Sequence, residues 1–246
     1  MNDPVVYFEV GAADPAPLRP FYAELFGWRF ADVAGGGYTL IDTAGGAGIN
    51  GGLGRSRAGT SWATFYVSVD DPSAVLLRAG SLGGKTVVPV TEVRGTITFA
   101  MFDDPDGSLV GLVQRGAEGP AAREPSGGDG ACVDWFEVIG SEAARTQAFY
   151  NDLFGWRFEG GDSGYGLVEA ASAGGRIGGG VGAGTTEGSS TWATFYAHVA
   201  SVEAAFRKAE QMGGGRVYGP KAVSGLKTGA LRDPAGSVIG VYQEDH

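Results

Sequence analysis

Apolar and polar positions along the first part of the chain predict a strand followed by a helix. Residues 5–10 alternate in character and are rich in β-branched and aromatic side chains, which is typical of a half-buried strand. Farther on, Phe21 and Leu25 recur at helical spacing, and Gly27 stands where a glycine commonly ends a helix. We therefore expect a strand at 5–10 and a helix that begins near Asp14 and ends at Gly27.

The next residues repeat that order. Strands are expected around residues 38–41 and 64–69, and the second of them leads into an expected helix at 72–82. Two closing strands follow, joined by the sequence DPDG at 104–107, whose proline and glycine suit the positions of a tight turn. The order predicts two βαβββ units in succession, although the pattern indicates the third strand of each only weakly.

The whole pattern occurs twice along the chain. The decapeptide FYAELFGWRF at 21–30 returns as FYNDLFGWRF at 149–158, with eight of ten residues identical. Gly155 is therefore expected to end a helix as Gly27 does. Three shorter matches keep nearly the same spacing: FEV at 8–10 and 136–138, WATFY at 62–66 and 192–196, and DPDGS at 104–108 against DPAGS at 233–237. We predict two modules, at 1–115 and 131–246, joined by a linker at 116–130 that is rich in glycine, proline, alanine and charge.

Composition and charge exclude several classes of function. The chain has 246 residues, of which 43% are hydrophobic, so it can fill a real core. Its net charge of −10, without a basic stripe, argues against binding to nucleic acid. We find no targeting segment and no apolar run of roughly 18 to 20 residues, so we expect a cytoplasmic protein that does not bind a membrane. Cys132 is the only cysteine, which excludes an intramolecular disulfide and predicts a filler role for this thiol.

These motifs, in this order, resemble the vicinal oxygen chelate superfamily, which includes glyoxalase I, bleomycin-resistance proteins and extradiol dioxygenases. The resemblance rests on FYxxLFGWRF after a strand–helix opening, on the second opening after WATFY, and on the closing turn DPxG, each found twice. It covers nearly the whole chain. The glycine-rich stretches GGAGINGGLG and GGRIGGGVGAG resemble tandem members, some of which belong to antibiotic pathways. The resemblance implies an α+β fold of two tandem modules, each of paired βαβββ units that form a curled, cup-shaped antiparallel sheet with helices on its convex face.

The resemblance also implies where a metal would be held, and those positions carry unsuitable residues. Metal-dependent members use His, Glu or Gln from the first, the restarted and the last strand of a cup. The corresponding positions here are Tyr7, Thr64 and Gly111 in the first module and Trp135, Thr194 and Gly240 in the second. A transition metal needs several His or carboxylate ligands, and the chain has two histidines in all. We therefore expect no metal and no cofactor.

Strand alternation sorts many aromatic residues onto one face of each module. If Phe8 and Val10 pack beneath the helix, their neighbours in the strand look into the cup. The expected ligand-binding residues are Tyr7, Asn50, Trp62, Thr64 and Tyr66 in the first module and Trp135, Trp192, Thr194 and Tyr196 in the second. Aromatic walls with a few polar groups are typical of a small-molecule pocket, whereas the alternative is that these residues fill the seam between the modules.

Three ionisable residues are candidates for proton transfer. Glu9 and Glu137 each stand mid-strand in an apolar run, where burial would raise the pKa of a carboxyl group and suit it to acid–base catalysis. Their alternative role is an ion pair with Arg29 or Arg157, or exposure at a strand edge. His198 would serve as a base near neutral pH, or would have a structural or exposed role.

Two classes of function fit these observations. The first is a metal-independent binding protein that holds a flat aromatic or polyketide-like metabolite or drug, for sequestration, resistance or an accessory role in specialised metabolism. The second is a metal-free isomerase, cyclase, hydratase or lyase in which Glu9, Glu137 or His198 moves protons. A metal-dependent glyoxalase or dioxygenase ranks behind both. Because the fusion can supply within one chain the pairing that single-module relatives obtain as dimers, we expect a monomer, with a homodimer as the alternative.

Overall fold

The computed structural model confirms the predicted order of strands and helices. It describes residues 3–33, 35–56, 59–93, 97–119, 123–160, 164–168, 177–184 and 191–245; parts of the linker and of the second glycine-rich stretch lie outside them. Within the described residues, four helices and two sheets, of eight and seven strands, make an α+β fold with two modules. None of these helices has the length and apolar character that a membrane crossing requires.

Contacts divide the chain into two compact units that do not coincide with the sequence modules. Unit 1 consists of Met1–Tyr7, Thr64–Ala122 and Trp135–Ala193. Unit 2 consists of Phe8–Ala63, Arg123–Asp134 and Thr194–His246. Each unit therefore combines one half of the first module with one half of the second. The module boundaries at 115 and 131 describe the sequence repeat and remain a prediction.

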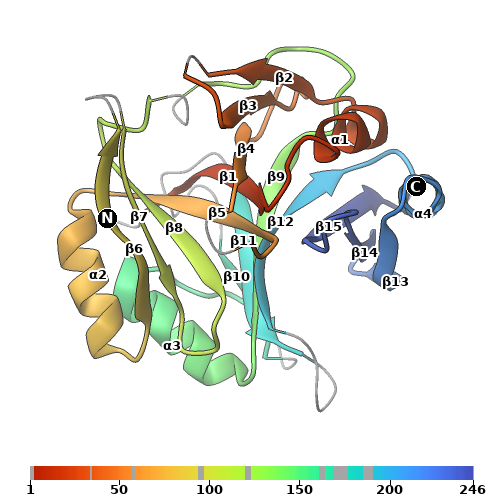
Figure 1. The fold of residues 1–246 in the computed structure, drawn as a ribbon. Helices are drawn as coiled ribbons and strands as arrows, with labels where there is room; N and C mark the ends of the chain where they lie inside the picture. Colours follow the sequence, from red (N-terminus) through yellow and green to blue (C-terminus); the bar gives the residue numbers. More distant parts are fainter. Residues whose placement is uncertain are drawn as a thin grey trace. The chain divides into compact units, whose positions relative to one another are not determined.

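Unit 1 holds one strand–helix–strand motif from each module. The first comprises β5 (Trp62–Val69, in this unit from Thr64), α2 (Pro72–Ser81), β6 (Lys85–Val93), β7 (Ile97–Asp103) and β8 (Leu109–Gln114), in the strand order β5-β8-β7-β6. The second comprises β9 (Val133–Gly140, in this unit from Trp135), α3 (Ala143–Phe154), β10 (Gly166–Val168) and β11 (Gly178–Ala183), in the order β10-β11-β9. Helix α2 packs against β6, β7 and β8, and α3 packs against β11 (Figure 1).

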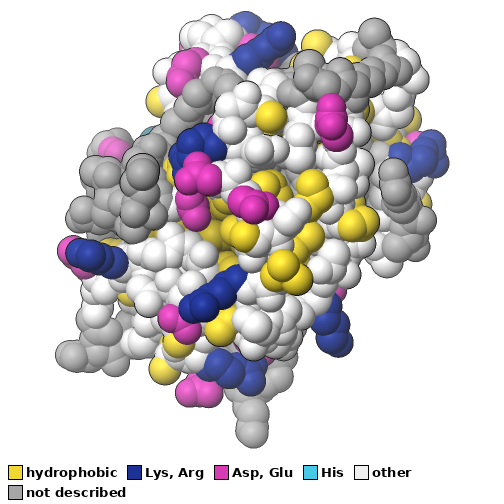
Figure 2. Space-filling model, turned by 90° about the vertical axis from the view of Figure 1, so that its left-hand side faces the viewer, with side chains coloured by type: hydrophobic (Ala, Val, Ile, Leu, Met, Phe, Trp, Pro, Cys, Tyr) yellow, Lys and Arg dark blue, Asp and Glu magenta, His cyan; other side chains and the backbone are white. Residues whose placement is uncertain are grey.

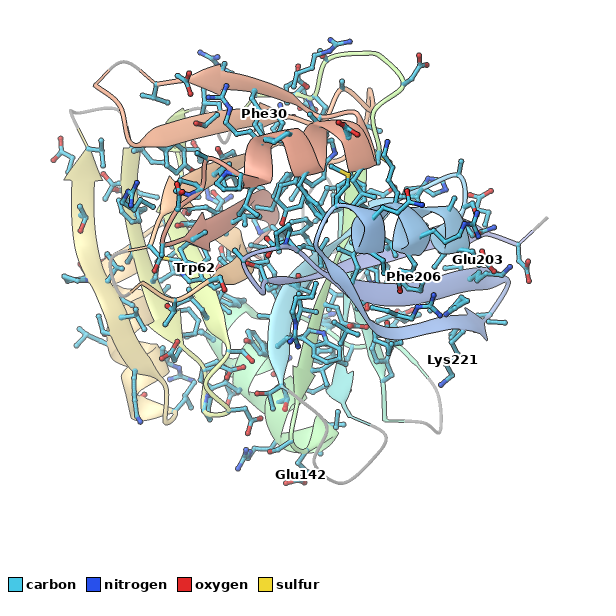
Figure 3. The ribbon with its side chains drawn as sticks, turned by 45° about the vertical axis from the view of Figure 1, so that its right-hand side comes forward. Phe30, Trp62, Glu142, Glu203, Phe206 and Lys221 are labelled. Carbon is cyan, nitrogen blue, oxygen red and sulfur yellow. The ribbon has the colours of Figure 1, made fainter. Side chains whose placement is uncertain are left out.

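Unit 2 is built in the same way. Its first motif comprises β1 (Val5–Ala12, in this unit from Phe8), α1 (Leu18–Phe26), β2 (Arg29–Asp32), β3 (Tyr38–Asp42) and β4 (Gly51–Arg55), in the order β2-β3-β4-β1. Its second comprises β12 (Trp192–His198, in this unit from Thr194), α4 (Val202–Gln211), β13 (Gly215–Val223), β14 (Leu226–Arg232) and β15 (Val238–Glu244), in the order β12-β15-β14-β13. Phe206 of α4, labelled in Figure 3, packs its ring against Gly229 of β14.

The sheets are mixed, which corrects the expectation of antiparallel sheets. In all four motifs the first and last strands pair in parallel: β1 with β4, β5 with β8, β9 with β11, and β12 with β15. Other pairs, such as β3 with β4 and β7 with β8, are antiparallel. Parallel neighbours need a long connection, and the helix with its following strands provides one.

Helices α1 and α3 end at the predicted glycines, but α1 begins at Leu18 and not near Asp14 as expected. Gly27 and Gly155 end α1 and α3 in the left-handed conformation, with φ angles of 73° and 69°. Glycine adopts that conformation without the steric cost that a Cβ would add. At the starts of α2 and α4, the side chains of Asp71 and Ser201 accept hydrogen bonds from backbone N–H groups of the first turn.

The two repeated motifs meet in the core of each unit. In unit 1, the Tyr150 hydroxyl of FYNDLFGWRF donates to the buried Asp104 carboxylate of the DPDG turn at 2.9 Å. In unit 2, the Tyr22 hydroxyl of FYAELFGWRF donates to the buried Asp233 carboxylate of the DPAG turn at 2.7 Å. Each tyrosine therefore donates to the turn of the opposite module. In each unit the decapeptide supplies the donor of a buried hydrogen bond, and the DPxG turn supplies its acceptor.

A buried tryptophan completes the same core in each unit. In unit 1, Trp156 stacks on Tyr150 with ring centroids 5.5 Å apart, and its indole N–H donates to the carbonyl oxygen of Asp3 at 2.8 Å. In unit 2, Trp28 stacks on Tyr22 at 5.3 Å and donates to the carbonyl oxygen of Ala131 at 2.8 Å. The decapeptide thus supplies the last turns of a helix, the glycine that ends it, and aromatic side chains of the core.

One face of unit 1 keeps apolar side chains in solvent. Leu77 of α2 and Val87, Val90 and Val93 of β6 are exposed. Figure 2 shows hydrophobic side chains on the side of the molecule where α2 and β6 lie in Figure 1. Strand β6 is the last in its strand order, so these valines belong to an edge strand.

Candidate functional site

A buried carboxylate lies between two aromatic donors in unit 1. Glu137 stands in the middle of β9 and is 8% exposed. One of its carboxylate oxygens accepts a hydrogen bond from the Tyr165 hydroxyl, and the other accepts one from the indole N–H of Trp192, each at 2.9 Å. Hydrogen bonds to an ionised group are stronger than those between neutral groups, so the three side chains hold one another in place. The structure therefore brings together the predicted residues Glu137 and Trp192.

Glycines of β11 leave space beside this carboxylate. In the parallel pairing of β9 and β11, Trp135 is opposite Gly178 and Glu137 is opposite Gly180. Paired residues point to the same face of the sheet, so β11 presents no side chain next to either residue. The Tyr165 ring uses part of this space, because a Cβ added to Gly180 would lie 2.0 Å from the Tyr165 hydroxyl oxygen. Glycine at position 180 thus allows Tyr165 to reach Glu137.

The first module carries the same three residue types in unit 2. A Cβ added to Gly54 would lie 3.2 Å both from a Glu9 carboxylate oxygen and from a Tyr38 ring carbon, so these two side chains approach the same glycine. Trp62, labelled in Figure 3, lies with its ring against the backbone of β1. Glu9 is half-buried, whereas Glu137 is buried. The set around Glu137 is therefore the more enclosed of the two copies.

Two other predicted residues of the first module are neighbours in unit 1. The rings of Tyr7 and Tyr66 meet edge to face with centroids 6.2 Å apart, and both residues are buried. Farther along β5, the hydroxyl of Ser68 donates to the Glu118 carboxylate at 3.0 Å. Within unit 1, β5 therefore presents aromatic and polar side chains, and Tyr66 among them contacts Tyr7 of β1.

Asn50 and Tyr196 have defined partners in unit 2. The Asn50 side-chain oxygen accepts a hydrogen bond from the backbone N–H of Thr43 at 3.0 Å, and its amide donates to the carbonyl oxygen of Arg123 at 3.5 Å. Asn50 therefore fixes the backbone around the first glycine-rich stretch. The Tyr196 hydroxyl is 2.7 Å from the Tyr218 hydroxyl, in hydrogen-bond contact.

His198 belongs to a cluster of polar side chains in unit 2. Its ring stacks on Tyr242, with centroids 4.7 Å apart and an angle of 6° between the planes. The Asp134 carboxylate accepts hydrogen bonds from the Tyr242 hydroxyl at 2.7 Å and from the Cys132 thiol at 3.3 Å. Burial, and then the charge of Asp134, raise the pKa of the Cys132 thiol to about 12. Cys132 therefore has polar partners, whereas the sequence predicted a filler.

Sequence reasoning missed several members of these clusters. For Tyr165 a signal exists, because Tyr38 stands at the same place in the repeat, before the glycine-rich strand. For Tyr242 the local pattern offers none, because Asp134 lies on another strand and meets it only through the strand register. Cys132 and Asp134 stand two residues apart, so strand alternation was the available signal for their contact.

A family model supports the relationship that the motifs indicate. Residues 5–112 match the Glyoxalase/Bleomycin resistance protein/Dioxygenase superfamily. The first module therefore resembles this superfamily in sequence. The match runs from β1 into β8, and the second module repeats the same order of elements.

Several known proteins are similar to this chain over its whole length. The Anthracycline biosynthesis protein DnrV of Streptomyces peucetius is 27% identical, over 96% of this chain and 92% of DnrV. The Mn(II)-bound glyoxalase from Novosphingobium aromaticivorans superposes with a TM-score of 0.65 at 17% identity, covering 100% of this chain and 83% of its own. Homoprotocatechuate 2,3-dioxygenase from Arthrobacter globiformis gives 0.64 at 16% identity, covering 100% and 80%. At these identities the two structures establish the fold alone.

Two of the positions that the superfamily resemblance assigns to metal ligands are buried threonines. The Thr64 hydroxyl donates to the carbonyl oxygen of Leu109 at 2.5 Å in unit 1. The Thr194 hydroxyl donates to the carbonyl oxygen of Val238 at 2.7 Å in unit 2. Both hydroxyls therefore tie the restarted strand of a motif to its last strand.

Tyrosine rings cover two more of these superfamily positions. A Cβ added to Gly111 would lie 2.4 Å from a ring carbon of Tyr66, its partner in the strand pairing. A Cβ added to Gly240 would lie 2.3 Å from a ring carbon of Tyr196, again its partner. A longer residue at either position would therefore have to displace a tyrosine.

Proposed function

We propose that the chain binds a flat, hydroxylated aromatic compound of polyketide type at Glu137, Tyr165 and Trp192, without a metal. The observation that carries the proposal is the buried Glu137 carboxylate, held by two aromatic donors beside a strand of glycines. Such binding serves sequestration or resistance, or an accessory role in specialised metabolism.

The three side chains suit this ligand in different ways. An ionised Glu137 carboxylate is an acceptor-only group, the type of group to which a phenolic hydroxyl of the ligand donates. Trp192 is half-buried, and the face of an indole ring favours stacking on a flat aromatic system. Gly178, the strand partner of Trp135, adds no side chain of its own beside the site, whereas Gly180 lies under the Tyr165 ring.

The residues at the implied metal positions support binding without a metal. The two threonines donate to backbone carbonyl groups, and the two glycines lie under tyrosine rings. The remaining two of the six positions carry Tyr7, a phenol, and Trp135, an indole. This set does not fit a divalent transition metal, which needs converging His, Cys or carboxylate ligands. The proposed binding therefore involves no metal at these positions.

The comparisons support the class of ligand. DnrV, which matches 96% of this chain, is named for anthracycline biosynthesis. Anthracyclines are flat, hydroxylated aromatic polyketides, the shape and polarity that the residues around Glu137 favour.

Calorimetric titration of the full chain with a hydroxylated anthraquinone tests the proposal. We expect one molecule bound per chain. Trp192→Phe and Glu137→Gln should each weaken binding about tenfold, about 1.4 kcal/mol, because each removes a hydrogen bond to or from an ionised group. The matched controls Trp62→Phe and Glu9→Gln, at the same positions of the first module, should change the affinity less than about twofold. No binding, or equal losses in both modules, would contradict the proposal.

The buried Glu137 carboxylate also favours a second candidate function, metal-free proton transfer. A carboxylate next to a bound phenol or enol can accept a proton in an isomerisation or cyclisation. In that case the compound would be altered on incubation, and Glu137→Gln would abolish the change while binding persisted. Glu9→Ala and His198→Ala are the comparison variants, since these are the other predicted acid–base residues. Turnover that survives Glu137→Gln would exclude this role for the residue.

A further inference from the structure

Three potential metal ligands of different chemical type converge in unit 2. The Cys132 sulfur, an Asp134 carboxylate oxygen and a His198 ring nitrogen all lie within 4.8 Å of one another, and all three residues are half-buried. Cys132 and Asp134 flank the start of β9, and His198 ends β12. The backbone N–H of His198 donates to the Cys132 carbonyl oxygen at 2.9 Å, which fixes the two segments side by side.

We propose that Cys132, Asp134 and His198 form a binding site for one thiophilic divalent cation, of which zinc is the type. Thiolate, imidazole and carboxylate are the ligand types that zinc takes in proteins, and three protein ligands leave a fourth, tetrahedral position for water. The site is separate from the Glu137 set of the proposed function, and it involves none of the positions that the superfamily resemblance assigns to metal ligands.

The first module provides an internal comparison for this cluster. In unit 1 the backbone N–H of Ser68 donates to the Pro4 carbonyl oxygen at 2.8 Å, the same bond that joins His198 to Cys132 in unit 2. At the positions of Cys132, Asp134 and His198, the first module has Pro4, Val6 and Ser68. The backbone arrangement therefore forms without the three ligand-type side chains, so the fold does not account for their presence.

Neighbouring groups hold two of the ligands in position. Asp134 accepts a hydrogen bond from the Tyr242 hydroxyl, and the His198 ring stacks on the Tyr242 ring. In the first module, Val113 pairs with Ser68 where Tyr242 pairs with His198. Tyr242 thus orients a carboxylate and an imidazole, as groups around a metal site commonly do.

The hydrogen bonding of Cys132 favours a metal ligand over a nucleophile. The Cys132 thiol donates to the Asp134 carboxylate at 3.3 Å, so the sulfur already faces a second ligand-type atom and not a base that would activate it for attack. A bound divalent cation supplies the positive charge that the cluster lacks. On binding, the S–H bond breaks, a bond from sulfur to the metal forms, and the proton leaves to solvent.

Titration of the tag-free, full-length chain with Co²⁺ tests the site. Cys132 is the only cysteine, so a near-ultraviolet charge-transfer band from thiolate to cobalt can report this residue alone. We expect the band to saturate at one equivalent, to be displaced by Zn²⁺ and to be absent in Cys132→Ser. His198→Asn should lower the affinity at least tenfold, and Tyr242→Phe, which loses the hydrogen bond that orients Asp134, should lower it about tenfold.

Alkylation of Cys132 by iodoacetamide gives a second readout that does not depend on the serine variant. Zn²⁺ should slow alkylation at least tenfold in the unsubstituted chain and much less in His198→Asn. No charge-transfer band, or alkylation at the same rate with and without Zn²⁺, would overturn the proposal. Neither result bears on anthraquinone binding at Glu137, so the two proposals fail independently.

Discussion

At the scale of single residues, two buried tyrosine–aspartate pairs join the decapeptide of one module to the DPxG turn of the other. Burial raises the pKa of Asp104 and of Asp233, and the hydrogen bonds from Tyr150 and Tyr22 act in the opposite direction on these pKa values. The pKa of each tyrosine is raised well above its usual value, again first by burial. The hydroxyl groups therefore stay protonated and act as donors to the carboxylates.

Removal of either hydroxyl should destabilise the fold. Tyr150→Phe and Tyr22→Phe each leave a buried carboxylate without one of its donors, and we expect a loss of about 1–3 kcal/mol in the free energy of unfolding. Urea denaturation followed by circular dichroism measures the loss. The control Ser81→Ala removes an exposed hydroxyl and should stay within about 0.5 kcal/mol. Phenylalanine variants as stable as this control would show that the pairs do not support the core.

Asp3 should make the stability of the chain depend on pH. Its side chain pairs with Arg115 at 3.0 Å, yet burial raises its pKa from 3.8 to about 6. Because the folded state binds this proton more tightly than the unfolded chain does, the contribution of Asp3 to stability falls as pH rises through this range.

The comparison variant for this effect is Asp3→Asn. The stability of the unsubstituted chain relative to Asp3→Asn should decline between about pH 4 and about pH 6, as measured by the midpoints of urea denaturation. A difference that stays constant over this range would mean that the pKa of Asp3 is not raised in the folded state.

At the scale of elements, Gly180 of β11 leaves the space that the Tyr165 ring occupies, so its role is to position a neighbouring side chain and not to make the strand flexible. Gly180→Ala should push the Tyr165 ring away from Glu137, because the added Cβ would overlap the Tyr165 hydroxyl oxygen. We expect weaker anthraquinone binding, about tenfold. Gly80 of α2 is the matched control: a Cβ there meets nothing within 4 Å, so Gly80→Ala should keep the affinity and stabilise the helix by about 0.5–1 kcal/mol. Unchanged binding in Gly180→Ala would exclude Tyr165 from the site.

The order of the elements could be predicted from the sequence because their signals are local. Alternation, helical spacing and the cap glycines Gly27 and Gly155 each act within a few residues. The parallel pairing of first and last strands was not predicted, because it depends on how a motif closes in space. The partners of Tyr22 and Tyr150 were missed for the same reason: each lies in the opposite module.

The candidate sites show the same limit. Glu137 and Trp192 could be selected because alternation places a residue on one face of a strand, and the structure joins them by a hydrogen bond. Cys132 and His198 come from different strands, and only the strand register brings them together. Local periodicity carries no information about that register.

At the scale of the whole molecule, each compact unit needs residues from both modules. Unit 1 takes Thr64–Ala122 from the first module and Trp135–Ala193 from the second. We expect a monomer of 25.2 kDa, and the edge strands β6 and β13 favour it, because each carries a proline and register shifts that hinder pairing with another chain.

Cutting the linker should therefore leave the two pieces associated. A protease site inserted between Gly127 and Gly128, which are exposed, allows the cut in the folded protein. Light scattering after size exclusion should give the mass of the uncut monomer, and the pieces should separate only in denaturant. Two folded pieces that separate without denaturant would show that each module forms a core alone.

Native mass spectrometry of the full chain, incubated with a hydroxylated anthraquinone, tests the proposed binding function most directly. The predicted result is one ligand per chain that is released with its mass and its NMR spectrum unchanged, and a Glu137→Gln variant that retains far less of it. A released compound of altered structure, an isomer of equal mass included, would contradict simple binding and support proton transfer at Glu137. A chain that retains no aromatic compound would contradict both functions at this site.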